Sequence, residues 1–243
     1  MKNNTVRLSI LLASFVSLWV IISVFQSTAI WFVIINIVAI CIIAKYKNAD
    51  KKAVFLGFVF GIICIPSSVI MGISVILPYI ASVCVFKKSS NKIYIFNNGK
   101  KSWPVITLIL TFVVGGVLGF INILFALSAM AINPSFNIQW FIDALRAGVF
   151  EEIFFRLFFF ALCIIVTKDK PLSRMQNILC YIIMIVPHVL IHFNLQSFNI
   201  GSFIMLSLLF GLPFAIMQRK VNLISAIGVH SFVDLLRFCV LGV

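Results

Sequence analysis

Residues 104–131 read PVITLILTFVVGGVLGFINILFALSAMA, a stretch without one charged side chain. The hydrocarbon core of a bilayer is about 30 Å thick, and an α-helix needs about 20 apolar residues to cross it. Backbone polar groups in lipid must be satisfied within the segment, so this stretch predicts a transmembrane helix. The whole chain is similar: of its 243 residues, 63% are hydrophobic and 10% are charged, and the mean hydropathy is +1.19. Soluble domains have about 45–50% apolar and about 25% charged residues. We therefore expect the lipid bilayer to be the solvent of this protein.

The same length criterion, applied outward from this stretch, predicts an all-α fold, a polytopic bundle of about eight hydrophobic segments. The N-terminal run is longer than the about 7–15 residues of a signal-peptide core, so we interpret it as a spanning helix. The run at 53–86 contains Pro66 and Pro78 and is too long for one simple span, so we expect a hairpin or a broken helix there. The predicted segments are 8–25, 29–44, 53–86, 104–131, 141–166, 178–195, 203–217 and 222–241.

The net charge of +13 does not indicate nucleic-acid binding, because Lys and Arg lie between the apolar runs rather than on one face. Sixteen of the nineteen basic residues fall at the N-terminus, at 45–52, at 87–101, at 167–177 and at 219–220. The positive-inside rule places all five in the cytoplasm if 53–86 crosses twice or re-enters. We thus predict a multi-pass protein of the cell membrane with a cytoplasmic N-terminus. The six cysteines lie in or beside apolar runs and are interpreted as packing residues.

Several ionisable groups remain at membrane depth once the loops are set aside. Each charged group at a helix centre costs about 2.5–3.5 kcal/mol on insertion scales, so such groups default to a functional interpretation. Asp143 and Arg146 lie nearer the edge of a segment. The deeper groups are Glu151, Glu152, Arg156, His188, His192, His230, Asp234 and Arg237.

The spacing of these groups repeats. Glu152 and Arg156, His188 and His192, and His230 and Asp234 are each four residues apart, which places both members on one helix face. Glu151 is rotated by about 100° from Glu152. If Arg156 pairs with Glu152, Glu151 is left to act as a general base. A purely structural ion pair explains Glu152 and Arg156 but not Glu151 or the histidines.

In order along the chain, these residues resemble the motifs of the CPBP family. This family comprises the CAAX proteases and bacteriocin-processing enzymes and is also called the Abi family. The first motif, E-E-x-x-x-R, is Glu151, Glu152 and Arg156. The second, F-x-x-x-H, fits His192, although His188 stands at its Phe position; Asn194 follows closely. The third, H-x-x-x-N or H-x-x-x-D, fits His230 and Asp234. The resemblance covers about 141–241, and it implies N-terminal helices at 1–103 and a CPBP-like catalytic bundle at 104–243, integrated in one membrane domain.

The resemblance implies an intramembrane endopeptidase with a glutamate-activated water. Glu151 and His192 would position and deprotonate the water, and His230 with Asp234 would stabilise the oxyanion. Arg156 would hold Glu152, while His188 is either an aromatic replacement or an additional active group. Asp234 would either be protonated or orient His230. Glu151, His192 and His230 are also the candidates for a divalent metal such as zinc, but H-E-x-x-H is absent and metal-independent chemistry is favoured. The expected partners are membrane-associated peptides or protein tails.

Other classes of protein explain part of the pattern. A non-catalytic membrane scaffold or bacteriocin self-immunity protein would keep the fold without the reaction. A proton-coupled transporter would use buried Glu, His and Asp as a relay, but it predicts paired broken helices, and only the break at Pro66 is found. A structural bundle leaves three histidines without a role.

Overall fold

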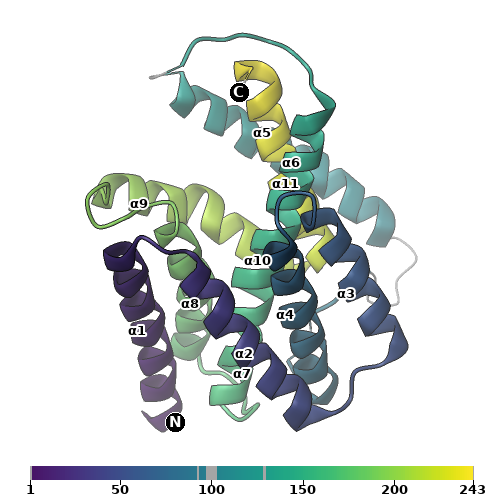
Figure 1. Cartoon of the computed structure of the whole chain (residues 1–243), viewed down its shortest axis with the longest axis vertical. Coiled ribbons are helices and arrows are strands. Elements are labelled where there is room, and N and C mark those ends of the chain that lie inside the picture. Colours follow the sequence, from purple (N-terminus) through teal and green to yellow (C-terminus); the bar gives the residue numbers. More distant parts are fainter. Residues whose placement is uncertain (1, 92, 97–102, 128–129, 243) are drawn as a thin grey trace. The chain divides into compact units, whose positions relative to one another are not determined.

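The computed structural model describes residues 2–91, 93–96, 103–127 and 130–242, and its elements within these ranges are all helices (Figure 1). Lys92, Lys100 and Lys101 of the predicted basic loop lie outside the described residues. The helices are α1 (Lys2–Phe25), α2 (Ala29–Tyr46), α3 (Lys51–Cys64), α4 (Val69–Lys88), α5 (Trp103–Ala126), α6 (Ile138–Glu151), the π-helix η1 (Glu152–Leu157), α7 (Phe158–Val166), α8 (Arg174–Leu190), α9 (Ile200–Leu206), the π-helix η2 (Ser207–Gly211), α10 (Leu212–Lys220) and α11 (Leu223–Leu241).

Six helical stretches among the described residues are long and apolar enough to cross a bilayer. The predicted segment 141–166 is not one of them, because it carries five charged side chains, among them Glu151, Glu152 and Arg156. Helix α8 is apolar but shorter than the six stretches. The predicted number of about eight hydrophobic segments is therefore approximate. The all-α, multi-pass membrane architecture is confirmed. The six stretches are Asn3–Phe25, Ala29–Tyr46, Val69–Lys88, Trp103–Ala126, Ile200–Lys220 and Leu223–Leu241.

The long run at 53–86 forms a helical hairpin, one of the two expected forms, in which α3 and α4 pack side by side and run antiparallel. Helix α3 ends at Cys64, just before Pro66, and α4 begins after Ser68. Helix α3 has 14 residues, which at 1.5 Å per residue is about 21 Å and shorter than the hydrocarbon core. A Cβ on Gly61 would meet the Ile76 side chain and lie 3.1 Å from the Gly72 carbonyl oxygen, so glycine permits this close packing of α3 on α4.

An ion pair joins the N-terminus of α3 to the C-terminus of α4. The Asp50 carboxylate caps α3 by accepting a hydrogen bond from the Ala53 amide at 2.7 Å, and Lys87 Nζ lies 2.6 Å from Asp50 Oδ2. The hydrogen bond from Lys87 and the bond from the Ala53 amide hold the pKa of Asp50 below its usual value. The pair therefore stays charged at neutral pH and ties the first turn of α3 to the last turn of α4.

The chain forms two compact units. Unit 1 consists of residues 1–92 and 153–215, and unit 2 consists of residues 93–152 and 216–243. The core of unit 1 is rich in phenylalanine. Phe159 stacks on Phe15 with ring centroids 4.0 Å apart, and Phe155 meets Trp31 edge-on at 5.8 Å. The aromatic run after the two glutamates thus anchors η1 and α7 against α1 and α2.

Helix α8 lies beside α1 in unit 1 (Figure 1). A capping box starts α8, with Ser173 and Gln176 bonded reciprocally. At its C-terminus, α8 ends at Leu190. Trp19 of α1 donates its indole Nε1–H to the carbonyl oxygen of Phe193 at 2.9 Å. This bond holds the segment after α8 against α1.

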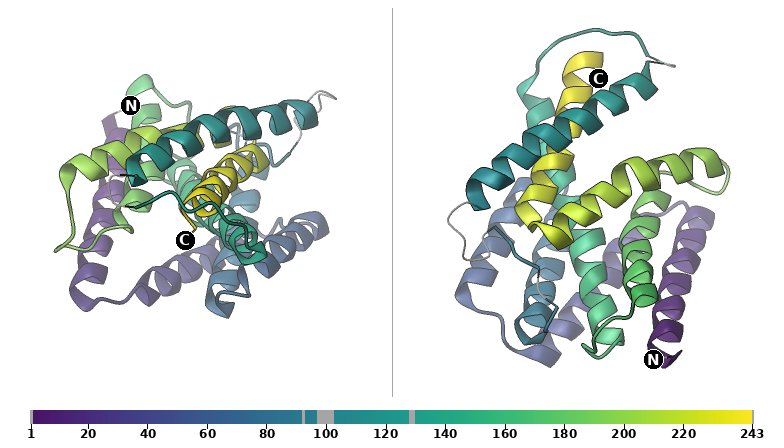
Figure 2. Two further views of the ribbon diagram at one scale, coloured as in Figure 1. Left: turned by 90° about the horizontal axis from the view of Figure 1, so that it is seen from above. Right: turned by 180° about the vertical axis from the view of Figure 1, so that it is seen from behind.

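Unit 2 is built on close contacts of α11 with α5 and α6, and Figure 2 shows α5 crossing α11. Gly115 and Gly119 are spaced as in a G-x-x-x-G motif, in which small residues let membrane helices approach. A Cβ on Gly115 would lie 3.0 Å from Phe232, and one on Gly119 would lie 2.7 Å from Leu236. The glycines therefore fix how deeply α11 packs on α5.

Candidate active site

The two glutamates lie where a helix changes its winding. Helix α6 ends at Glu151, and η1 begins at Glu152 and includes Arg156. π-helical turns are rare and are frequently found at functional sites. The E-E-x-x-x-R motif therefore spans the junction of an α-helix and a π-helix.

His230 of α11 lies between the two carboxylates in unit 2. Its Nδ1 is 2.9 Å from Glu152 Oε1, and its Nε2 is 3.5 Å from Glu151 Oε2. Glu152 is fully buried and His230 is 6% exposed, whereas the Glu151 side chain is 16% exposed. Asp234 Oδ2 lies 3.6 Å from Nε2 of the same ring. Unit 2 thus brings together four of the predicted site residues.

The contact with Glu152 fixes the orientation of the imidazole. When Glu152 is ionised, its carboxylate only accepts hydrogen bonds, so the His230 tautomer with a proton on Nδ1 donates the hydrogen bond to it. Asp234 is too far from Nε2 for a hydrogen bond, at 3.6 Å. Among the described contacts, Glu152 therefore orients His230, and Nε2 faces the more accessible Glu151 and Asp234.

The sequence pattern predicted that the Glu151 and Glu152 side chains point to different partners, and the structure differs from this prediction. A rotation of about 100° was expected to turn Glu151 away from Glu152. Both carboxylates instead approach His230, one at each ring nitrogen. A single imidazole can receive both because Nδ1 and Nε2 lie on different sides of the ring.

The other predicted site residues belong to unit 1. Arg156 is fully buried, its Nη2 lies 2.8 Å from His188 Nδ1, and its guanidinium lies 5.3 Å from the centre of the Phe214 ring. Arginine has no acceptor, so His188 Nδ1 must accept, which leaves the proton of a neutral imidazole on Nε2. The rings of His188 and His192 meet edge-on, with centroids 5.4 Å apart.

His192 is not in a helix, although the segment 178–195 was predicted to be one. Helix α8 ends at Leu190, and His192 lies exposed in the turn that follows. The expected same-side arrangement with His188 is nevertheless present, because the first turn after the helix continues its path. Asn194 follows, and its Oδ1 accepts hydrogen bonds from the amides of Gln196 and Ser197.

Comparison with known families identifies this part of the chain. Residues 133–236 match the family model described as type II CAAX prenyl endopeptidase, Rce1-like. The predicted family is confirmed. The match spans all three motifs and supports a CAAX-type intramembrane protease fold for this segment. No curated protein and no solved structure matches the chain at a significant level.

One residue of the Rce1-like segment was not predicted to belong to the site. Gln218 of α10 is 1% exposed and donates from Nε2 to the backbone oxygen of Glu152 at 2.9 Å. It thus supplies a side-chain donor to the first carbonyl of η1. The only signal in the sequence is an amide side chain at the end of an apolar run, next to the basic pair 219–220, and this pattern is too common to single it out.

The donors in unit 2 fit part of a metal site. Two ligand atoms bound at about 2.0–2.1 Å to one tetrahedral zinc lie about 3.4 Å apart, and Glu151 Oε2 and His230 Nε2 are separated by 3.5 Å. Glu152 on Nδ1 would act as the carboxylate that orients a metal-binding histidine. Glu151 and His230 would supply two of the three protein ligands of a catalytic zinc ion, which lowers the pKa of a bound water to about 7. The third predicted ligand, His192, belongs to unit 1, and the metal stays a prediction.

The contact of His188 with Arg156 can be tested by substitution. Replacing His188 with Phe restores the residue of the family motif and keeps a ring beside Phe155, 5.5 Å away. The buried Arg156 guanidinium loses an acceptor, however, and a hydrogen bond to a charged group contributes about 1.5–3 kcal/mol. We expect His188→Phe to lower the free energy of unfolding by about that amount, measured by denaturant titration in detergent.

His188→Gln serves as the matched comparison, because its amide oxygen can accept from Arg156. It is expected to lose less stability than His188→Phe. Equal stability of His188→Phe and the parent protein would show that the Arg156 contact is not important for the fold.

Proposed function

We propose that the protein is an intramembrane endopeptidase, which hydrolyses peptide bonds of membrane-associated peptides or of protein tails. The observation that carries this proposal is the position of His230 between the Glu151 and Glu152 carboxylates, 3.5 and 2.9 Å from them. The Rce1-like match over the same segment supports it. Buried acids and an imidazole in contact are the groups that peptide hydrolysis requires.

Glu151 is proposed as the general base, because it is the more exposed of the two glutamates and a water can reach it. Its carboxylate takes a proton from the water, and the oxygen attacks the carbonyl carbon of the peptide bond. The proton is then passed to the leaving amine, which leaves Glu151 ionised again. The family motif assigns His192 to holding this water, and that role is part of the proposal.

His230 is proposed to stabilise the oxyanion. Its Nδ1–H is engaged by Glu152, so when Nε2 also carries a proton it can donate to the negative oxygen of the tetrahedral intermediate. Glu152 compensates the positive charge of the ring in that state. Asp234 is proposed to keep the ring in place from the same helix. Arg156 is proposed to hold Glu152, as the family motif implies.

Isotope labelling tests whether the protein catalyses hydrolysis. The purified protein is reconstituted in liposomes with lipid-anchored reporter peptides in H₂¹⁸O, and the products are analysed by mass spectrometry. We expect cleavage with one ¹⁸O in each new carboxylate. A parallel reaction with a zinc chelator separates metal-dependent from metal-independent chemistry. Intact peptides across a broad reporter set would instead favour a scaffold or an immunity protein with the same fold.

A further inference from the structure

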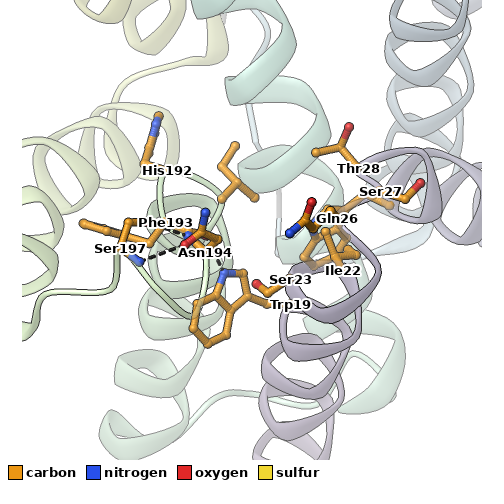
Figure 3. A pocket seen from close by; sticks show the side chains of 12 residues that line it. Trp19, Ile22, Ser23, Gln26, Ser27, Thr28, His192, Phe193, Asn194 and Ser197 are labelled. Atoms are coloured by element: carbon orange, nitrogen blue, oxygen red, sulfur yellow. Dashed lines mark hydrogen bonds between the residues drawn. The ribbon is translucent and has the colours of Figure 1, made fainter.

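Unit 1 contains a pocket of about 400 Å³ next to His192. It lies where α1 ends, α2 begins and the chain leaves α8. Figure 3 shows the His192 side chain at one edge of the pocket, Trp19 at another, and Gln26 across the opening from Asn194. Its volume is in the range of about 300–1,000 Å³ that small ligands occupy.

The lining of the pocket is polar but uncharged. Half of its residues carry neutral amide or hydroxyl groups, and His192 is the one titratable residue in the lining. An anionic headgroup would require Arg or Lys, and neither lines this pocket. The neutral polar residues are Ser23, Gln26, Ser27, Thr28, Asn194 and Ser197.

A buried donor in the wall points to a ligand. Trp31 lines the pocket and is 3% exposed, and its indole Nε1–H has no hydrogen-bond partner among the described residues. Buried indole N–H groups usually have a partner. Contacts with Phe15 and Phe155 hold the ring in place, with centroids 6.0 and 5.8 Å away. Trp19, which also lines the pocket, already donates its Nε1–H to the carbonyl oxygen of Phe193.

We infer that this pocket binds an extended, uncharged segment of the substrate peptide, and that Trp31 Nε1–H donates to one of its carbonyl oxygens. A peptide main chain offers an acceptor and a donor at each residue, which match the neutral lining. A peptide carbonyl is costly to bury without a hydrogen-bond donor, and Trp31 Nε1–H supplies one. The inference rests on the proposed function, because the segment that it places in the pocket belongs to the peptide substrate proposed there.

Peptide binding tests the pocket without any need for catalysis. Two dye-labelled peptides with the same lipid anchor carry either Gly-Ser-Asn-Thr-Gln-Gly or Gly-Asp-Lys-Asp-Lys-Gly, and their binding to detergent-solubilised Glu151→Gln protein is followed by fluorescence anisotropy. We expect the neutral peptide to bind at least tenfold more tightly. Adding Trp31→Phe, which keeps a ring but removes the N–H, should weaken its binding about three- to tenfold.

Trp140→Phe is the matched control, because Trp140 does not line the pocket, and it should leave binding unchanged. Ser23→Leu, which fills the pocket from α1, should weaken binding of the neutral peptide at least tenfold. Thermal unfolding of each variant confirms that it is folded. Equal binding of the two peptides, or unchanged binding by both Trp31→Phe and Ser23→Leu, overturns the inference.

The two proposals fail in different ways. If the neutral peptide binds as described but no peptide is ever cleaved, the proposed function is wrong and the pocket remains a peptide site. If cleavage occurs but Trp31→Phe and Ser23→Leu change neither binding nor KM, the proposed function stands and the pocket inference is wrong.

Discussion

Glu151→Gln is expected to reduce the rate of peptide cleavage by about 10³-fold, because it removes the proposed base while keeping the shape of the side chain. General bases contribute about 10²–10⁴-fold to such reactions. Binding of substrate should change little, so the loss should appear in kcat rather than in KM. The measurement is the initial rate of reporter cleavage in liposomes.

Asp143→Asn is the matched control for Glu151→Gln. Asp143 is on the same helix, but its carboxylate lies near Arg146 at 3.4 Å and accepts from Gln139 at 3.1 Å. Asp143 has no role in the proposed reaction, and surface substitutions usually change stability little. Asp143→Asn should therefore leave kcat within about twofold of the parent. A Glu151→Gln protein as active as Asp143→Asn would remove Glu151 from the mechanism.

Gly148→Ala is expected to disrupt unit 2, because a methyl group at this position has no space. Its Cβ would overlap Ser231 Oγ and lie only 2.9 Å from the Ile227 carbonyl oxygen and 3.2 Å from the Ser231 amide nitrogen. The backbone of α11 must therefore move, and overpacking of this kind costs about 1–3 kcal/mol. Because Gly148 is one turn before Glu151, the same shift should separate Glu151 from His230 and greatly lower cleavage.

Gly116→Ala separates this steric effect from the general effect of removing a glycine. A Cβ on Gly116 would meet no atom nearer than 4.0 Å, the Phe232 Cε1. The variant should therefore be at least as stable as the parent when unfolded with denaturant in mixed micelles. Similar losses in Gly148→Ala and Gly116→Ala would mean that the close approach of α6 and α11 is not required.

Much of the fold follows from the sequence because lipid leaves few alternatives for an apolar chain. The long apolar runs had to be helices, and Pro66 predicted the break between α3 and α4. The exact path at the polar groups did not follow. η1 departs from the period of 3.6 residues on which the sequence pattern rests, so that pattern cannot anticipate it.

The candidate site was predictable as a set of residues but not as a set of contacts. The four-residue spacings correctly placed His188 beside His192, and His230 near Asp234. They did not indicate that Glu152 rather than Asp234 would bond to His230, because that contact joins different helices. Gln218 was missed for the same reason, since its partner is a backbone carbonyl 66 residues away in sequence.

A double-mutant cycle on Glu151 and His230 tests the central claim most directly, namely that these two groups act together on one water and one peptide bond. Cleavage rates are measured for Glu151→Gln, His230→Ala and the double variant under saturating reporter peptide. The account predicts that the double variant is at most about threefold slower than the slower single variant, because residues that act as a unit are not additive. Losses that multiply in the double variant, or single variants that cleave at the parent rate, would contradict it.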